Sequence, residues 1–572
     1  MTVRSRGFGQ QLVYCLFYRL AERRPFWAAL QRSACLGPEG ITSVRKIGIV
    51  GSGPTAIYLL KHLSSSDDPL AITFFEASPR AGTGMPYDPA LNADYMLCNA
   101  FSREIPAPVR PLVDWLREQP ARELGEWELS AHDLTARAFY PRVLIGEYLH
   151  SQFSELCENA RDIGHEIDIL TKCRVTDIEA ANDMRSTVRY ECGQSIKTLQ
   201  FDAVVIASGH SWPDVPEIDG VKLVSPWPNT NITGLEQNDI GVLGSSLSAI
   251  DIVITLGHAR GEFQESGGRI SWLAADTDNA LRITMVSKMG IMPEGDFYYP
   301  FPYEPLTCLT RDAMDFEIDQ GSDGLLDRIF QLLCDELDVA DPDYLDRLPE
   351  TARTLEGFGP AYFSDRREVG GLRAVKRDLL ESRETMRCKE TIPHRYALLR
   401  AHVAIDHILR QLSEEDYWRF LDHLMPVFAD CYAAVPHLSL ARVTALFDAG
   451  VLALVATEEE AEFGLSDDGI IEIDSEDGTI RFDVMLDARG QSPSSPADLP
   501  FPSLVKALRD PEEPVLRPFI LDLAKADASP IYCLALPQLL ERYPFSQGLV
   551  ECSKNARHVA DDILRKWSKQ GS

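Results

Sequence analysis

The 572-residue sequence contains no C-x-x-C pair, although it has 12 cysteines. Scattered cysteines argue against a disulfide scaffold, a zinc site and a redox-active dithiol, and they indicate free thiols in a reducing compartment, the cytoplasm. The sequence also lacks a run of about 18 apolar residues, so no integral membrane helix is expected. No repeat with a period of about 20–50 residues is visible, which disfavours a solenoid.

Positive charge is scarce as well, since 56 Lys and Arg stand against 87 Asp and Glu and the formal net charge is −31. Such a chain repels nucleic acid and anionic membranes, so neither is an expected partner. The beginning of the chain is the exception, because residues 1–45 carry seven Arg and two Glu. We expect a basic helical extension at 1–44 that packs on the body or on a second subunit of a homo-oligomer. A targeting or membrane-surface helix is the alternative.

Apolar strands and amphipathic helices alternate along much of the chain, which predicts an α/β fold. A strand at 46–50, a helix at 55–63 and a strand at 71–76 form one parallel βαβ unit. A second alternating unit begins near residue 240. The sequence therefore predicts two dinucleotide-binding Rossmann-like domains, of which the first is discontinuous.

The expected domain boundaries follow from these patterns and from a long helical stretch. They are a discontinuous FAD-binding domain at 45–235 and 456–572, an NAD(P)H-binding domain at 236–309, and a helical insertion at 310–455 that serves as a substrate lid.

The motif GSGPTA at 51–56 follows the first strand directly. Gly51 permits a tight turn, Gly53 lets the backbone approach a pyrophosphate, and Ala56 allows close packing of helix on strand. The helix start supplies free N–H groups and partial positive charge for phosphates. Glu76 ends the next strand, where a carboxylate accepts hydrogen bonds from a ribose. The unit fits FAD or NAD.

Two later segments favour FAD. Residues 201–209 read FDAVVIASG and residues 482–490 read FDVMLDARG. Each has the pattern of a buried strand that leads into a glycine near a flavin nucleotide. Gly209 would let a loop cross close to the cofactor, and Asp487 and Gly490 occupy matching places in the second segment.

The second nucleotide loop is GSSLS at 244–248, between a strand and a helix. Ser246 stands where a second glycine is usual, and its Cβ narrows the approach of a phosphate. Lys288, after the next strand, would pair with the 2′-phosphate of NADPH and so favour that cofactor. The alternative is that Lys288 is an ordinary solvated lysine, in which case NADH is equally possible. The residues expected at this site are Gly244, Ser245, Ser246, Ser248, Ser287 and Lys288.

Three stretches resemble FAD/NAD(P)-binding proteins that are grouped with the flavin-dependent N-hydroxylating monooxygenases. They lie at 82–99 (GTGMPYD…YMLCN), 139–149 (FYPR…GEYL) and 544–549 (PFSQGL). The resemblance runs from about residue 45 to the C-terminus. Within that family, VPHLS at 435–439 and QGL at 547–549 resemble the aspartate N-hydroxylases that form nitrosuccinate.

The loop and the resemblance together imply a set of FAD contacts. These are Gly51, Ser52, Gly53, Pro54, Thr55, Ala56, Glu76, Asn99, Arg142, Val175, Gly209, Asp487, Gln547, Gly548 and Leu549. By resemblance, Asn99 would lie near the isoalloxazine ring and Arg142 near the pyrophosphate.

The resemblance implies an NADPH-using, FAD-dependent monooxygenase that hydroxylates the amine nitrogen of a small substrate with O₂ through a flavin hydroperoxide. Aspartate is the suspected substrate. The alternatives are a flavin reductase that passes electrons to another acceptor, and a non-catalytic FAD-binding protein. Candidate catalytic residues are His437 and Asn99, with His394 as a further polar group. Candidate carboxylate-binding residues are Arg366, Arg367, Arg395 and Arg442.

Overall fold

The structure is a computed structural model, and it describes residues 44–180, 185–212, 215–276, 280–457, 463–466, 468–475, 478–525 and 527–570. The basic extension expected at 1–44 therefore lies outside the described residues, apart from Val44. All elements described below belong to the unit Arg45–Ser572.

The first sheet has five parallel strands in the order β19-β7-β1-β2-β3. Their bounds are β1 (Arg45–Val50), β2 (Leu70–Phe75), β3 (Glu166–Leu170), β7 (Ala203–Ile206) and β19 (Ile531–Cys533). The central strands are buried on both faces, which explains why they read as continuous apolar runs.

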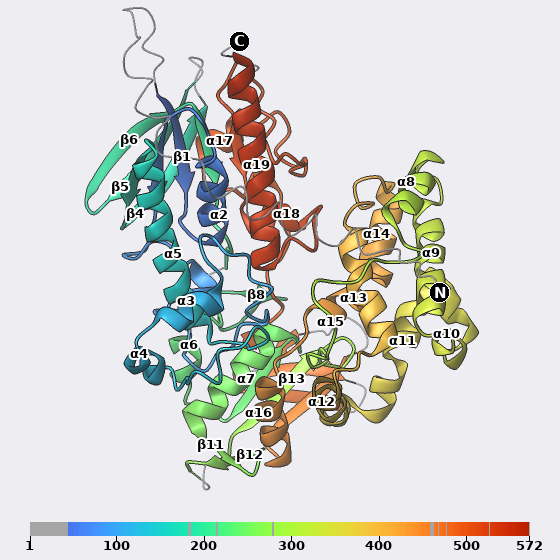
Figure 1. Cartoon of the computed structure of the whole chain (residues 1–572). Coiled ribbons are helices and arrows are strands. Elements are labelled where there is room, and N and C mark those ends of the chain that lie inside the picture. Colours follow the sequence, from blue (N-terminus) through green and yellow to red (C-terminus); the bar gives the residue numbers. More distant parts are fainter. Residues whose placement is uncertain are drawn as a thin grey trace, which may run out of the picture. The chain divides into compact units, whose positions relative to one another are not determined.

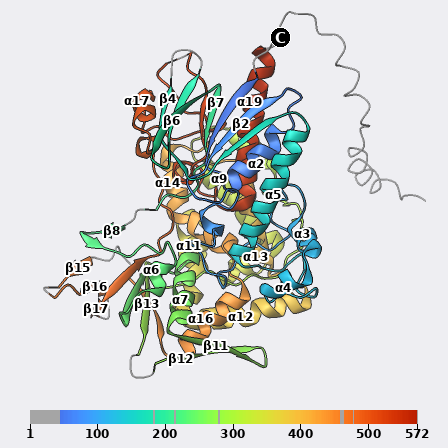
Figure 2. The same cartoon turned by 90° about the vertical axis from the view of Figure 1, so that its left-hand side faces the viewer.

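Both faces of this sheet are covered (Figure 2). Helices α2 (Pro54–Leu63), α5 (Arg142–Asp162) and α19 (Gly548–Gln570) pack on one face. The antiparallel strands β4 (Cys173–Ala180), β5 (Ser186–Cys192) and β6 (Ser195–Phe201) lie on the other. There the ring of Phe75 contacts the rings of Tyr190 and Phe201.

The second sheet has four parallel strands in the order β14-β13-β10-β18. They are β10 (Asp239–Leu243), β13 (Arg282–Ser287), β14 (Leu452–Ala456) and β18 (Val484–Asp487). Helices α7 (Leu247–Arg260), α12 (Gly371–Cys388) and α16 (His437–Asp448) share its apolar core. A small antiparallel sheet, β15 (Phe463–Leu465), β16 (Ile471–Ser475) and β17 (Gly478–Phe482), packs beside it.

Two of the domain boundaries expected from the sequence do not match the second sheet. The expected boundaries place residues 451–455 in the helical insertion and residues 480–486 in the first domain. In the structure β14 pairs with β13 and β18 pairs with β10, so both complete the second sheet. The repeated pattern of Phe-Asp before a buried strand thus marks one strand in each sheet, because β7 pairs with β1 as β18 pairs with β10.

The stretch between the two halves of the second sheet is mostly helical, as the sequence predicts (Figure 1). Its further helices are α8 (Arg311–Asp319), α9 (Leu325–Ala340), α10 (Tyr344–Arg347), η2 (Glu350–Arg353), α11 (Leu355–Val369), α13 (Pro393–Ile405), α14 (Glu414–His423) and α15 (Met425–Tyr432). These helices enclose an apolar core of their own, into which Phe545 inserts from the segment before α19.

Short elements complete the described fold. They are η1 (Met85–Tyr87), α3 (Leu112–Glu118), α4 (Ala121–Glu126), β8 (Glu217–Ile218), β9 (Val221–Lys222), α6 (Thr230–Thr233), β11 (Gly261–Ser266), β12 (Arg269–Ala274), η3 (Pro496–Asp498), α17 (Pro502–Ala507) and α18 (Leu536–Leu540).

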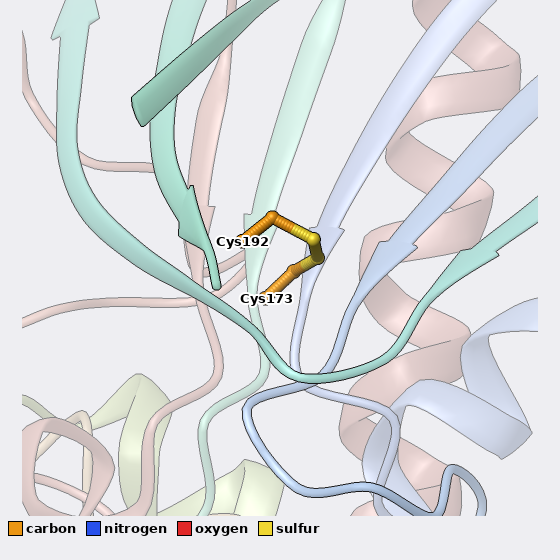
Figure 3. The surroundings of a disulfide bond; sticks show 2 residues. All are labelled: Cys173 and Cys192. Atoms are coloured by element: carbon orange, nitrogen blue, oxygen red, sulfur yellow. A yellow bond between two sulfur atoms is a disulfide. The ribbon is translucent and has the colours of Figure 1, made fainter. Parts of the chain in front are cut away.

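One cysteine pair is bonded, contrary to the expectation of free thiols throughout. Cys173 begins β4 and Cys192 ends β5, and the strand register places them opposite each other with a Cα–Cα distance of 4.4 Å (Figure 3). The two cysteines are 19 residues apart in the sequence, so no short cysteine motif indicates that they are paired. The disulfide joins the first two strands of the antiparallel sheet.

Candidate cofactor site

A cavity of about 920 Å³ opens at the carboxyl ends of the first sheet's strands. Its walls come from segments far apart in sequence, which lie within 50–91, 173–175, 207–217, 487–500 and 534–555. The carboxyl edge of a doubly wound parallel sheet is the usual position of a nucleotide site.

The glycine loop forms one wall of this cavity. Gly51 has a φ of +99°, and a Cβ there would lie 2.4 Å from the carbonyl oxygen of Ala207, so only glycine fits. Gly53 is the N-cap of α2 and no side chain caps that helix end, which leaves N–H groups for an anionic ligand. Residues 51–55 line the cavity, whereas Ala56 is fully buried behind it.

Glu76 also faces the cavity. Its carboxylate accepts hydrogen bonds from the Ser52 hydroxyl at 2.7 Å and from the Ser78 N–H at 2.8 Å. These donors fix the carboxylate beside the glycine loop. Glu76 is distant from the glycine loop along the chain but lies beside it in the structure. This is the position that a ribose-binding acid occupies in a dinucleotide-binding fold.

The cavity continues past Glu76 along the start of β4. Cys173, Arg174 and Val175 line it there, and the N–H of Cys173 donates to the carbonyl of Glu76 at 2.9 Å. The disulfide therefore lies next to this end of the cavity. Gly209, with a φ of +72°, lines the wall after β7.

The opposite wall is built by late segments of the chain. Gly548 and Leu549 start α19 and line the cavity, whereas Gln547 does not belong to the lining. Asp487 lines it as well and accepts two hydrogen bonds from Arg489, each of 2.8 Å. The second sheet thus contributes residues to the same cavity as the first.

Asn99 and Arg142 lie elsewhere than expected. Asn99 is exposed and is not among the lining residues. Arg142 is at the start of α5, where its side chain donates to the carbonyl of Leu97 and pairs with Asp251 at 2.7 Å. It therefore faces the helix of the second fold and not the cavity.

His210 is a lining residue that the sequence did not single out, although it follows Gly209 directly. Burial, and then the positive charge of Arg142, lower the pKa of His210 to about 4. The imidazole is therefore neutral at physiological pH, and it can form a hydrogen bond to a ligand as an uncharged group.

The second glycine loop repeats the geometry of the first. Gly244 has a φ of +122°, and a Cβ there would lie 2.8 Å from the carbonyl oxygen of Ala488. Ser246 is the N-cap of α7 and is exposed. The Ser245 hydroxyl is already engaged, since it donates to Ser287 at 2.9 Å and lies 2.5 Å from the carbonyl oxygen of Ile291. Ser248 lies in the first turn of α7, and Lys288 is exposed after β13.

The arginines expected to bind a substrate carboxylate do not line the cavity. Arg366 makes a buried two-point ion pair with Asp430, at 3.0 and 2.7 Å. Arg395 is also buried and pairs with Glu294 at 2.9 Å and with Asp378 at 3.1 Å. Both guanidinium groups are thus paired with carboxylates inside the protein.

The remaining candidates also lie away from the described cavity lining. Arg367 is an exposed residue of α11, and Arg442 of α16 donates to the carbonyl of Tyr95 at 3.0 Å. The Nε2 of His437 lies 2.7 Å from the carbonyl oxygen of Asp296, and the Nδ1 of His394 lies 3.2 Å from Asp341. No described residue of 310–455 lines the cavity, so the expected role of this range as a lid is not seen.

The described residues contain neither a metal-binding cluster nor a membrane-spanning helix. No group of His, Cys, Asp and Glu with metal-binding geometry was found among them. None of their helices combines the length and the apolar character that crossing a bilayer requires.

Residues 48–211 match the family described as FAD-NAD(P)-binding. The match confirms the α/β dinucleotide-binding fold and the cofactors that the sequence predicts, FAD with NAD(P). Residues 310–432 match the family described as YdhS-like middle domain.

The uncharacterized protein YdhS of Escherichia coli (strain K12) is 35% identical over 532 residues, which cover 92% of this chain and 98% of that protein. The chain therefore belongs to the YdhS family, and the helical insertion contains the family's middle domain.

Two solved structures are similar along nearly the whole chain. The ornithine N-hydroxylase of Kutzneria sp. 744 has 15% identity and a TM-score of 0.46, over 92% of this chain and 100% of that one. The bacillithiol disulfide reductase of Bacillus cereus has 10% identity and a TM-score of 0.41, over 91% and 99%. Both are likenesses of fold.

Proposed function

We propose that this protein is an FAD-dependent, NADPH-using monooxygenase that oxidises the amine nitrogen of a small molecule with O₂. The observation that carries the proposal is the shared cavity: Asp487, which ends β18 of the second sheet, and residues 489–494 line the same cavity as the glycine loop of the first. A nicotinamide held by the second fold would then approach a flavin held by the first.

The residues present fit the cofactor. Gly51, Ser52, Gly53 and Thr55 would hold the pyrophosphate, Glu76 the ribose and Val175 the adenine. The start of α19 at Gly548 would present its N–H groups and partial positive charge to the far end of the flavin. FAD, when bound, supplies the acceptor for hydride and the activation of O₂.

The charges of the cavity favour a substrate that carries positive charge. Its described lining has five carboxylates (Glu76, Asp88, Glu217, Asp487 and Asp498) and two arginines (Arg174 and Arg489). Asp487 and Arg489 neutralise each other, and Glu76 and Arg174 both lie at the proposed adenosine end, so Asp88, Glu217 and Asp498 are the charges left for a substrate. An amine cation therefore suits the lining better than the two carboxylates of aspartate, which remains one of the substrates to test.

His210 would serve as a neutral polar group in the wall, because its low pKa leaves the imidazole without an extra proton to donate. A monooxygenase must keep its flavin site dry and short of free protons, because otherwise O₂ is reduced to hydrogen peroxide without product. Buried apolar residues 534–536 line the wall beside it.

The test is an absorbance spectrum of the purified protein before and after anaerobic NADPH, followed by air with single amines. We expect a flavin spectrum, bleaching by NADPH, and NADPH oxidation that one amine stimulates, with formation of its N-oxidised product. Fast NADPH oxidation that no amine affects would favour the reductase alternative. Protein that carries no flavin and binds none would favour the non-catalytic alternative.

A further inference from the structure

Arg142 and Asp251 join the two nucleotide-binding folds. Their side chains are 15% and 10% exposed, and the Nη2 of Arg142 lies 2.7 Å from the Oδ2 of Asp251. Arg142 is the first residue of α5 in the first fold. Asp251 is on α7, the helix that begins directly after the second glycine loop. Removing either partner would leave the other charge buried and uncompensated, so the pair couples the placement of the two helices.

Arg142 is in turn hydrogen-bonded to the loop at 96–97, and its helix packs on the cavity wall. Its N–H donates to the carbonyl of Met96 at 2.8 Å and its Nε to that of Leu97 at 3.1 Å. One turn along α5, a Cβ at Gly146 would lie 2.2 Å from the carbonyl oxygen of Tyr87, so α5 packs directly on the backbone of the lining segment 83–88. A shift of α7 is therefore transmitted through Arg142 to the wall.

The neighbouring loop makes two more contacts with the second fold. The ring of Tyr95 stacks on His258 of α7 with 4.0 Å between centroids, and the Tyr95 carbonyl accepts a hydrogen bond from Arg442 of α16 at 3.0 Å. These two contacts restrain the loop. Of the three contacts, the Arg142–Asp251 ion pair is the one in which both partners are charged and largely buried.

We propose that the Arg142–Asp251 pair is the positioning contact that sets the nicotinamide-binding fold against the flavin cavity. The inference rests on the proposed function, since it assumes that hydride passes between the two folds. Neither residue lines the cavity, so both would act through helix placement. A misplacement of about 1 Å costs such a transfer on the order of 100-fold in rate.

The test compares Asp251→Asn with the matched control Glu147→Gln. Glu147 lies on the same helix and pairs with Arg80 at 2.6 Å, but both partners belong to the first fold. Asp251→Asn should keep its FAD content and its full reduction by dithionite, while anaerobic reduction by NADPH slows roughly 10- to 100-fold. Asp251→Glu, which keeps the charge, should recover most of the rate, and Glu147→Gln should equal the wild type.

The outcomes separate the two proposals. Wild-type flavin that NADPH does not reduce refutes the proposed function, and hydrogen exchange then tests the contact itself: amides of 95–99 must exchange faster in Asp251→Asn than in Glu147→Gln. Reduction of Asp251→Asn at the wild-type rate overturns the inference. If Asp251→Asn does not fold, Arg142→Lys takes its place, and the same slowing at unchanged FAD content is required.

Discussion

Gly53→Val should remove FAD from the protein without unfolding it. Gly53 has a φ of −72° and a ψ of −170°, an extended conformation that valine accepts without strain. The nearest atom to an added Cβ is the Cα of Gly84 at 3.2 Å, so that loop must shift by a few tenths of an ångström. We expect overpacking of this kind to cost the fold about 1–3 kcal/mol.

The cost to the cofactor is larger. A valine side chain fills the space in which the pyrophosphate approaches the backbone, and it holds the phosphates away from the N–H groups at the start of α2. A hydrogen bond to a charged group contributes about 1.5–3 kcal/mol. Loss of two such bonds costs about 3–6 kcal/mol, which raises the Kd for FAD about 10²- to 10⁴-fold.

The assay is the ratio of flavin to protein absorbance after desalting, together with titration of the apoprotein with FAD. Gly125→Val is the control, because nothing lies within 4 Å of its Cβ position on α4. Gly51→Ala should behave differently and misfold, since position 51 combines a positive φ with the 2.4 Å contact to Ala207. Stoichiometric FAD in Gly53→Val would refute the placement of the pyrophosphate.

Three further predictions concern the second fold and the buried charges. Lys288→Glu should raise the KM for NADPH at least tenfold and leave that for NADH unchanged, as steady-state kinetics with both would show. Asp430→Ala should cost about 3–5 kcal/mol in urea unfolding, because buried Arg366 loses its two-point partner and is left with Glu294 at 3.9 Å, whereas Asp365→Ala at an exposed pair should cost less than about 1 kcal/mol. Burial raises the pKa of Glu104 to about 7, so its protonated form stabilises the fold at low pH and that contribution is lost as pH rises through 7. The urea midpoint should fall as pH rises from about 4.5 to 7, and it should fall less in Glu104→Gln.

The first βαβ unit could be predicted from sequence because its parts are local. Gly51, Gly53 and Glu76 lie within 30 residues, and strand, turn and helix each leave a pattern at that range. The acid could be placed beside the loop because adjacent parallel strands end at the same edge of a sheet. The same reasoning located Gly244 and its strand.

Long-range pairing could not be predicted in the same way. The apolar run of β18 fits either parallel sheet equally well, and only its pairing with β10 decides between them. The ion-pair partners of Arg366 and Arg395 could not be predicted from the sequence either. Asp430 and Glu294 lie on other elements, and carboxylates are frequent in this acidic chain. A charged residue in a helical segment gives no sign of the direction in which it points.

The repeated pattern has a physical meaning that the structure supplies. In each fold the glycine after the first strand has a positive φ. A Cβ added to that glycine would meet the carbonyl group of the alanine that follows a neighbouring strand. The pairs are Gly51 with Ala207 and Gly244 with Ala488. The loop can turn only because that strand passes beside it. Since β18 and α19 also supply the far walls of the cavity, residues 1–480 contain the whole first glycine loop and yet cannot form the site. The cofactor would therefore bind only after the last segments of the chain have folded onto the first.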